Sequence, residues 1–478
     1  MFLVFPFVFF FSVAAFADSQ KAVIPFKPVT TQHTIKIKGA VLSYHATVGV
    51  MPIYNNKNQL MTTMSYIAYV ADIKNKTRPV TFVWAGGPGA SSLTDNFLMS
   101  GPKTINVNAT TKTATLATNA NTWLPFTDLV YIDMAGTGWG RVNSASSKTV
   151  YSPWGDATTF SVFIQNYLQK QDRVNSPIYI LGESYGGFRA PLVVNNLLKQ
   201  SIRVKGMILL SPLLTNDYQL ADSGNNISYP LDIPTYIRTA LYFHRLSAAL
   251  QKNPEKTVRE GTQWAITQYP YYLLMGDSLS KKEETALVNT LSQYTGLSQA
   301  VIRNNHYRIY NYHFATEFLG SENKRLDFLD TRHIDNNINH AYGLYILHIG
   351  TLMSTYLTMY PLAMHDLFHD LGVNTTENYI NYFSPGWNYQ KINQTISVLH
   401  DDLVVNPEMK VLVGVGYYDN SVPYFRTETA LNQLLLPENL RKNITLQYYE
   451  AGHLFYTDPK AGPLFFENVK KFYKHRSE

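Results

Sequence analysis

A serine, an aspartate and a histidine, in that order along the chain, have the surroundings expected of a nucleophilic catalytic site. Ser184 lies in the Gly-Glu-Ser-Tyr-Gly segment at 182–186, between an apolar run at 178–181 and a helix-compatible segment at 190–199. Small residues on both sides of the serine allow a sharp turn from strand to helix, which presents the hydroxyl above a sheet. Ser184 is therefore predicted to be a nucleophile.

Two further residues can activate this serine. Asp419 follows the apolar run at 411–415, and His453 follows a second predicted strand at 446–450 and is preceded by Gly452. A serine hydroxyl needs a base that removes its proton, and a carboxylate commonly orients that base. The order Ser, Asp, His is one of the chain orders in which such triads occur.

A glycine-rich loop at 85–92 directly follows the buried run at 80–84. Glycines let the main chain approach a substrate closely, so its N–H groups can receive an oxyanion. A phosphate-binding loop would need Gly-Lys-Ser or Gly-Lys-Thr, which this loop lacks, and the Gly-Thr-Gly-Trp-Gly segment at 136–140 lacks the spacing of a dinucleotide site.

The other histidines give no reason to expect a metal site. His365 and His369 have the i, i+4 spacing of a zinc helix, but the glutamate of that motif is absent between them. The chain also has no cysteine, hence no thiolate ligand. We expect neither a metal nor a cofactor.

The arrangement of apolar runs predicts an α/β protein. Residues 33–38, 41–50 and 64–73 alternate like antiparallel strands at a sheet edge, and short continuous apolar runs follow at 80–84, 129–132, 178–181, 207–210 and 411–415. Continuous runs bounded by Gly, Pro or Asp are typical of parallel strands buried on both faces. We predict a mostly parallel, doubly wound sheet.

One part of the chain breaks this pattern. Between about 215 and 385 the strand-like runs disappear, and helical periodicity is present at 282–291 and 342–357. We predict a signal peptide at 1–17, a first core part at 18–215, a helical cap insertion at 216–385 and a second core part at 386–478.

Composition narrows the class of protein. The 478 residues are 45% hydrophobic and 15% charged with a net charge of +6, which excludes disorder and coiled coils, and the basic residues are scattered rather than clustered as nucleic-acid binding would require. The apolar segment 1–17 ends in Ala-Phe-Ala, a cleavage pattern of secretory signal peptides, and a retained anchor is the alternative. We expect a secreted or periplasmic protein with no nucleic-acid partner and no stable membrane partner.

Taken together, the motifs resemble those of the serine carboxypeptidases, peptidase family S10. The family's glycine-rich loop, its Trp…Asp-x-x-Gly-Thr-Gly segment, its serine elbow, its Gly-x-x-Asp-x-x-x-Pro motif and its Gly-His pair have counterparts in family order. These are residues 85–92, Trp123 with 133–140, 182–187, Asp419 with Pro423, and Gly452 with His453.

The resemblance implies an α/β-hydrolase fold and a role for each matching residue. It implies a triad of Ser184, His453 and Asp419, with an oxyanion hole formed by the N–H groups of Gly87 and Tyr185.

The resemblance also implies a clamp for the free C-terminal carboxylate of a peptide, in which this chain retains Gly86 and Glu183. Two polar members of the clamp differ, because Ala85 replaces an asparagine and Met99 stands where a second glutamate is counted along the loop. On this count Glu183 would lack the partner that shares its proton.

Three functions remain open from the sequence. The first is a serine carboxypeptidase that releases C-terminal residues from peptides with a free C-terminus through an acyl-enzyme on Ser184. The second is an esterase, another serine peptidase or an acyltransferase with the same triad, and the third is a non-catalytic binding protein. Side-chain preference, propeptide processing and oligomeric state are not determined by the sequence.

Overall fold

The computed structural model describes residues 24–73, 75, 77–108, 113–216, 224–335, 361, 363–383, 386–388 and 394–474. The predicted signal peptide at 1–17, the predicted helical segment at 342–357 and the predicted boundary at 385 lie outside the described residues.

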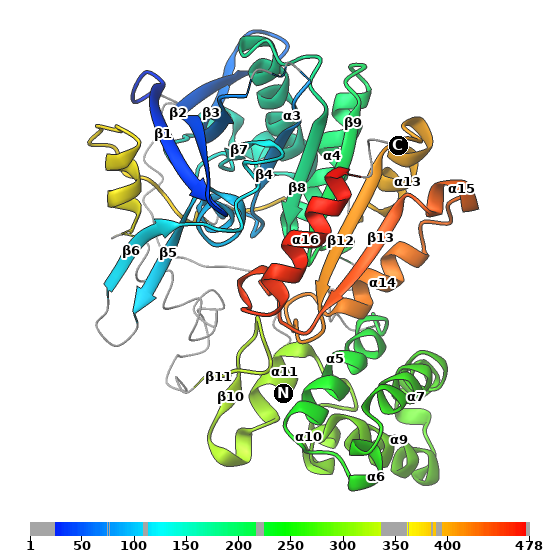
Figure 1. The fold of residues 1–478 in the computed structure, drawn as a ribbon. Coiled ribbons are helices and arrows are strands. Elements are labelled where there is room, and N and C mark those ends of the chain that lie inside the picture. Colours follow the sequence, from blue (N-terminus) through cyan, green and yellow to red (C-terminus); the bar gives the residue numbers. More distant parts are fainter. Residues whose placement is uncertain are drawn as a thin grey trace.

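A nine-stranded sheet forms the centre of the molecule (Figure 1). In spatial order its strands are β1 (Val29–Ile37), β2 (Ala40–Tyr54), β3 (Leu60–Ala71), β7 (Asp128–Ile132), β4 (Val80–Trp84), β8 (Ile178–Glu183), β9 (Val204–Leu210), β12 (Lys410–Gly416) and β13 (Ile444–Tyr449). The strands from β1 to β7 pair antiparallel, and those from β7 to β13 pair parallel. The predicted antiparallel edge and parallel centre are both present.

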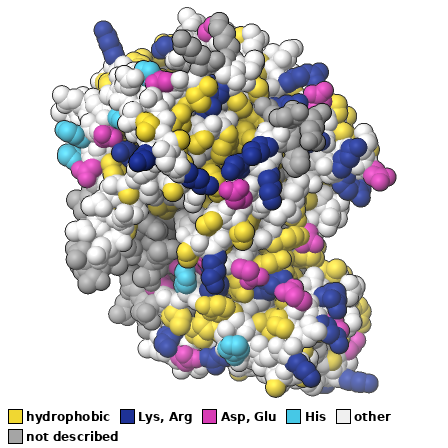
Figure 2. Space-filling model, in the orientation of Figure 1, with side chains coloured by type: hydrophobic (Ala, Val, Ile, Leu, Met, Phe, Trp, Pro, Cys, Tyr) yellow, Lys and Arg dark blue, Asp and Glu magenta, His cyan; other side chains and the backbone are white. Residues whose placement is uncertain are grey.

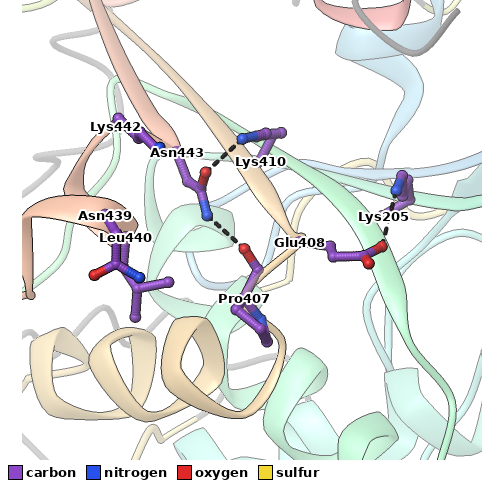
Figure 3. Close-up of a pocket in the computed structure, with 8 residues that line it drawn as sticks. All are labelled: Lys205, Pro407, Glu408, Lys410, Asn439, Leu440, Lys442 and Asn443. Atoms are coloured by element: carbon purple, nitrogen blue, oxygen red, sulfur yellow. Dashed lines mark hydrogen bonds and ion pairs between the residues drawn. The ribbon is translucent and has the colours of Figure 1, made fainter. Parts of the chain in front are cut away.

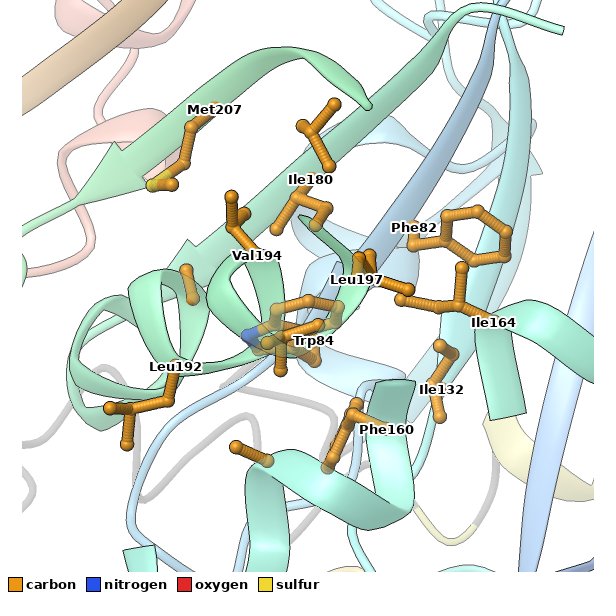
Figure 4. Close-up of a cluster of buried hydrophobic side chains, with 14 of the residues drawn as sticks. Phe82, Trp84, Ile132, Phe160, Ile164, Ile180, Leu192, Val194, Leu197 and Met207 are labelled. Carbon is orange, nitrogen blue, oxygen red and sulfur yellow. The ribbon is translucent and has the colours of Figure 1, made fainter. Parts of the chain in front are cut away.

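Alternate residues of the parallel strands supply two separate cores. Phe82 of β4 and Ile180 of β8 belong to one buried cluster (Figure 4), whereas Val83 and Leu181 belong to the other. Successive side chains of a strand point to opposite faces, so a strand that is apolar throughout is stable only when both faces are covered. This is why the parallel strands read as continuous apolar runs.

Helices provide that cover on both sides. α3, α4, α13 and α14 contribute to the cluster that contains Phe82, and α16 contributes to the other one. The helices of the core are α1 (Leu93–Asp95), α2 (Ser147–Val150), α3 (Pro153–Lys170), α4 (Tyr185–Leu198), α13 (Ile396–Val405), α14 (Tyr424–Asn432), α15 (Glu438–Arg441) and α16 (Ala461–Lys474).

A helical layer between β9 and α13 lies beyond one end of the parallel strands (Figure 1). It contains α5 (Ser228–Tyr242), α6 (Ala248–Gln251), α7 (Pro254–Thr267), α8 (Tyr269–Met275), α9 (Lys281–Thr295), α10 (Gln299–Asn304) and α11 (Asn311–Glu317), followed by a short hairpin of β10 (Arg325–Leu326) and β11 (Ile334–Asp335). These helices have a hydrophobic cluster of their own around Ile237, Leu287 and Phe314. The layer follows β9 in the chain, in the stretch where the sequence lacks strand-like apolar runs.

The sequence patterns did not predict one hairpin, formed by β5 (Lys103–Asn108) and β6 (Thr113–Thr118). Its strands largely alternate threonine or asparagine with isoleucine, valine, leucine or alanine, which is a strand-like pattern that the sequence analysis did not use, and few of their residues are buried. No helix in the described part of the chain is long and apolar enough to cross a membrane.

Candidate active site

Ser184 occupies the sharp turn between β8 and α4. Its backbone angles are φ 55° and ψ −121°, a region that costs a non-glycine residue about 1–3 kcal/mol and persists only where the surroundings enforce it. A side chain at Gly182 would lie 2.1 Å from the carbonyl oxygen of Gly186, so the turn closes only with a glycine there. The predicted strand–serine–helix elbow is therefore present, with Ser184 partly exposed.

His453 and Asp419 form a direct contact at the ends of neighbouring parallel strands. The His453 Nδ1 to Asp419 Oδ2 distance is 2.7 Å, and both side chains are buried. The other oxygen of Asp419 accepts hydrogen bonds from the N–H groups of Ser421 and Val422, each 2.8 Å long. Asp419 is thus held as an acceptor that fixes the orientation of the imidazole ring.

The environment of His453 changes its basicity. Burial lowers the pKa of the imidazole, but the charge and hydrogen bond of Asp419 and the charge of Glu183 raise it, and the net pKa is above 6.5. A carboxylate beside a histidine favours the protonated ring. The neutral ring is therefore a stronger base, suited to accept a proton and hold it until a leaving group takes it.

The glycine-rich loop lies against the serine elbow. A side chain at Gly86 would stand 2.7 Å from the backbone nitrogen of Tyr185 and 2.8 Å from Cβ of Ser184, and Gly87 has a φ of 106°. The backbone of this loop therefore approaches the Tyr185 N–H as closely as glycine allows. Gly86 is thus the loop residue that contacts the elbow, and an oxyanion hole formed by the N–H groups of Gly87 and Tyr185 stays a prediction.

Two buried charged residues to which the sequence analysis assigned no role support this loop. Arg189 of α4 donates to the carbonyl of Ala85 at 2.9 Å and pairs with the buried Asp156 at 2.6 Å. Asp133, at the end of β7, accepts hydrogen bonds from the N–H and hydroxyl of Ser92 at 2.9 and 2.8 Å. The Asp-x-x-Gly segment could have signalled the second residue, because its aspartate directly follows a buried strand.

A carboxyl group that was not predicted lies beside Glu183. Asp95, the last residue of α1, is fully buried, and Glu183 is its principal charged neighbour. Glu183 itself is buried and accepts a hydrogen bond from the hydroxyl of Tyr456 at 3.0 Å. The expectation that Glu183 has no acidic partner, because Met99 takes the counted position, is therefore wrong.

The reason is helical geometry. Asp95 lies four residues before Met99, where α1 passes into a π-helical turn at 96–100, so the position beside Glu183 is about one turn earlier than the position reached by counting along the loop. An acidic residue one turn before Met99 was the available signal. Met99 is buried in the apolar cluster around Val83.

This pairing changes the protonation of Asp95. Burial raises the pKa of Asp95, and the negative charge of Glu183 raises it further, to well above the usual value. Two adjacent buried carboxyl groups cannot both ionise without repulsion. The pair therefore retains a proton that can be donated to a third carboxylate.

A cavity of about 380 Å³ is lined by none of these residues (Figure 3). It is at the amino ends of β9 and β12, whereas Asp419 follows the carboxyl end of β12. Lys205 in its wall pairs with Glu408 at 3.3 Å.

In Figure 2 lysine and arginine side chains are interspersed with acidic ones on the visible face.

The described residues contain no group of three or more His, Asp or Glu side chains placed to hold a metal ion.

Comparisons with known proteins agree on one family. The family model of the serine carboxypeptidases, peptidase S10, matches residues 47–460. Serine carboxypeptidase S10 family member 1 of Dictyostelium discoideum is 27% identical over 170 residues, covering 34% of this chain and 39% of that protein. The pheromone-processing carboxypeptidase KEX1 of Candida tropicalis is 30% identical over 138 residues, covering 28% of this chain and 18% of that protein. The alignments thus span less than half the length of these curated relatives.

The fold agrees with this assignment. The structure of KEX1ΔP, a prohormone-processing carboxypeptidase from Saccharomyces cerevisiae, superposes with a TM-score of 0.58 at 13% identity, covering 90% of this chain and 91% of that one. The chain has an α/β-hydrolase fold, and because the family model spans most of its length, it belongs to the serine carboxypeptidase family.

Proposed function

We propose that the protein is a serine carboxypeptidase that releases C-terminal residues from peptides through an acyl-enzyme on Ser184. The observation that supports removal of C-terminal residues is the buried carboxyl pair of Asp95 and Glu183. Glu183 is the residue directly before Ser184 in the chain. Family membership and the contact between His453 and Asp419 support the hydrolytic part.

In the proposed reaction the hydroxyl of Ser184 attacks the carbonyl carbon of the last peptide bond while His453 takes its proton. The N–H groups of Gly87 and Tyr185 receive the negative charge on the carbonyl oxygen. His453 then protonates the leaving amine, the C–N bond breaks, and the released product is the C-terminal amino acid. Water, deprotonated by His453, hydrolyses the acyl-enzyme and restores Ser184.

The carboxyl pair gives this reaction its end-group selectivity. A substrate carboxylate next to two ionised carboxylates would be repelled, whereas a protonated carboxyl donates a hydrogen bond to it. Because the pKa of Asp95 is raised, this donor persists to higher pH than in an exposed aspartate. In our proposal Gly86, Glu183 and Asp95 together hold the peptide's free C-terminus.

A direct test compares a blocked dipeptide that has a free C-terminus with its amide. The proposal expects release of the last amino acid from the free acid, and a kcat/KM for the amide that is lower by at least about tenfold, the loss of one charged hydrogen bond. Equal rates for the two compounds would contradict the exopeptidase assignment while leaving the hydrolase intact. The Ser184→Ala variant is the blank.

One observation favours a second candidate, an esterase or acyltransferase with the same triad. Ala85 offers no side-chain amide to a carboxylate, and its carbonyl is already engaged by Arg189. Ala85→Asn separates the candidates: in a carboxypeptidase it lowers KM for the free acid and leaves an ester unaffected. No change for the acid would shift the assignment toward the second candidate.

The proposed location is outside the cytoplasm, on the basis of the sequence pattern at 1–17. The mature chain is then expected to begin at or near Asp18. Intact mass of exported protein measures this, and a mass that includes residues 1–17 would support a retained anchor instead.

We also propose that residues 216–385 act as one cap over the active site.

A further inference from the structure

A loop of the helical layer contacts the segment that carries His453. Residues 327–333 connect β10 to β11, and we name them the hairpin loop. The N–H of His453 donates to the carbonyl of Leu329 at 2.6 Å, and the N–H of Gly452 donates to Oδ2 of Asp330 at 2.9 Å. Two consecutive backbone donors of the histidine turn thus depend on this loop.

The packing leaves no freedom at this contact. A side chain at Gly452 would lie 2.1 Å from the carbonyl oxygen of Leu329 and 2.5 Å from Cβ of Asp330. On the other side, the carbonyl of His453 accepts a hydrogen bond from the hydroxyl of Ser211 at 2.8 Å. The main chain of His453 is therefore fixed from one side by the hairpin loop and from the other by the end of β9.

The same loop also contacts the segment that carries Asp419. The N–H of Thr331 donates to the carbonyl of Tyr418 at 3.0 Å. A second contact from the helical layer is reciprocal: the side-chain amides of Asn311 and Asn420 each donate to the other residue's carbonyl at 2.8 Å. Both triad segments are held by residues inserted between the two parts of the core.

An ion-pair network gives Asp330 its fixed position. Arg332 donates to Asp330 Oδ2 at 2.6 Å and to Asp458 at 2.9 Å, and it also donates to the carbonyl of Glu450. Asp458 accepts from the N–H of Ala461 at 2.9 Å, at the start of α16. Arg332 would keep Asp458 as a partner if Asp330 were replaced, so such a variant leaves no buried cation unpaired.

We propose that Asp330 is a positioning residue for the triad, which holds the Gly452–His453 turn so that the imidazole stays aligned with Asp419. The proposal rests on the triad assigned above but not on peptide specificity. A catalytic base acts only from a narrow range of positions, and a displacement of about 1 Å can cost about a hundredfold in rate. A charge-assisted hydrogen bond to a backbone N–H is strong enough to restrict such a displacement.

The experiment compares Asp330→Ala, Asp330→Asn and Glu322→Gln in the full-length protein. Asp330→Ala removes the acceptor of the Gly452 N–H, whereas Asp330→Asn keeps an oxygen there but loses the charge. Glu322→Gln, the matched control, breaks the exposed ion pair with Arg245 in the same helical layer. The readouts are kcat and KM against pH with an ester substrate, and the downfield proton NMR signal of the bond between His453 and Asp419.

For Asp330→Ala we expect kcat to fall by about tenfold to a hundredfold with KM changed less than about twofold. The acid limb of kcat should move to lower pH, because an imidazole displaced from Asp419 loses the contact that raises its pKa. The downfield signal should weaken. Asp330→Asn should be intermediate, and Glu322→Gln should match the wild type.

An unchanged kcat, pH profile and NMR signal in Asp330→Ala would overturn the proposal. So would a loss of kcat with an unshifted acid limb, which indicates general destabilisation. If Asp330→Ala does not fold, the same comparison is decided by Asp330→Asn. The NMR signal reports on the pair even if no peptide is cleaved, so failure of the proposed function and failure of this positioning role give different results.

Discussion

The buried carboxyl group of Asp95 lies beside that of Glu183, the residue that immediately precedes Ser184. Burial raises the pKa of Asp95 most, and the negative charge of Glu183 and the contact between the two carboxyl groups raise it further. A pair of this kind is unfavourable in an empty site and becomes useful when a ligand carboxylate accepts the shared proton.

The Asp95 carboxyl is expected to set the affinity for peptides. Asp95→Ala should raise KM for a peptide with a free C-terminus by about tenfold to a hundredfold, the loss of one charged hydrogen bond, and leave an ester unaffected. Asp95→Asn keeps a donor that does not titrate, so its KM should vary less with pH. Glu408→Gln, in the distant cavity wall, is the control. Equal KM effects on both substrates would refute this role.

Substrates with and without a free carboxylate should have different pH profiles. Peptide KM should rise as pH rises through the raised pKa of Asp95, because ionisation removes the donor and adds repulsion. For the ester, the rate should fall only on the acid side, as His453 becomes protonated. The midpoint of that fall should lie above pH 6.5, because the pKa of His453 is raised. Steady-state kinetics from pH 4 to pH 9 measures both, and parallel profiles would contradict the carboxyl pair's role.

The triad residues should differ in how much activity each variant retains. Ser184→Ala should abolish turnover and labelling by a fluorophosphonate with an unchanged fold, because only one oxygen is removed from a partly exposed turn. Asp419→Asn should retain more activity than His453→Ala, since the aspartate orients the ring but does not transfer the proton. Active-site labelling and kcat measure this. Turnover that survives in Ser184→Ala would exclude the mechanism.

Asp402 of α13 should make the protein less stable as pH rises. Burial raises its pKa to about 8, and only one of its oxygens has a partner, the amide of Asn195 at 3.0 Å. The folded state therefore keeps a proton that the unfolded chain loses near pH 4, so this stabilisation is full below about pH 4 and is lost as pH rises toward 8.

Asp402→Asn should remove this dependence. The difference in unfolding free energy between pH 5 and pH 8 should shrink by up to about 4 kcal/mol, three pH units at about 1.4 kcal/mol each. Urea denaturation at both pH values measures it, with Asp277→Asn at an exposed site of the helical layer as control. A variant with the wild-type pH dependence would show that Asp402 is not the group responsible.

The sequence by itself determined the features that are local in the chain. The elbow at Ser184 needs glycines within two residues, and each parallel strand appears as an apolar run because both of its faces are buried. The order of motifs then indicated the family, and with it the pairing of Asp419 with His453. These inferences needed no knowledge of which distant residues meet.

The tertiary structure decided the contacts between segments that are far apart in sequence. Counting along the loop assigned the second acid to the position of Met99. In the folded protein the acid beside Glu183 is Asp95, four residues earlier, because the path of the helix decides which side chain reaches Glu183. The hydrogen bond from the N–H of Gly452 to Asp330 connects the helical layer to the end of a strand more than a hundred residues later. No periodicity encodes such a contact, because it arises only when the layer and the sheet pack together.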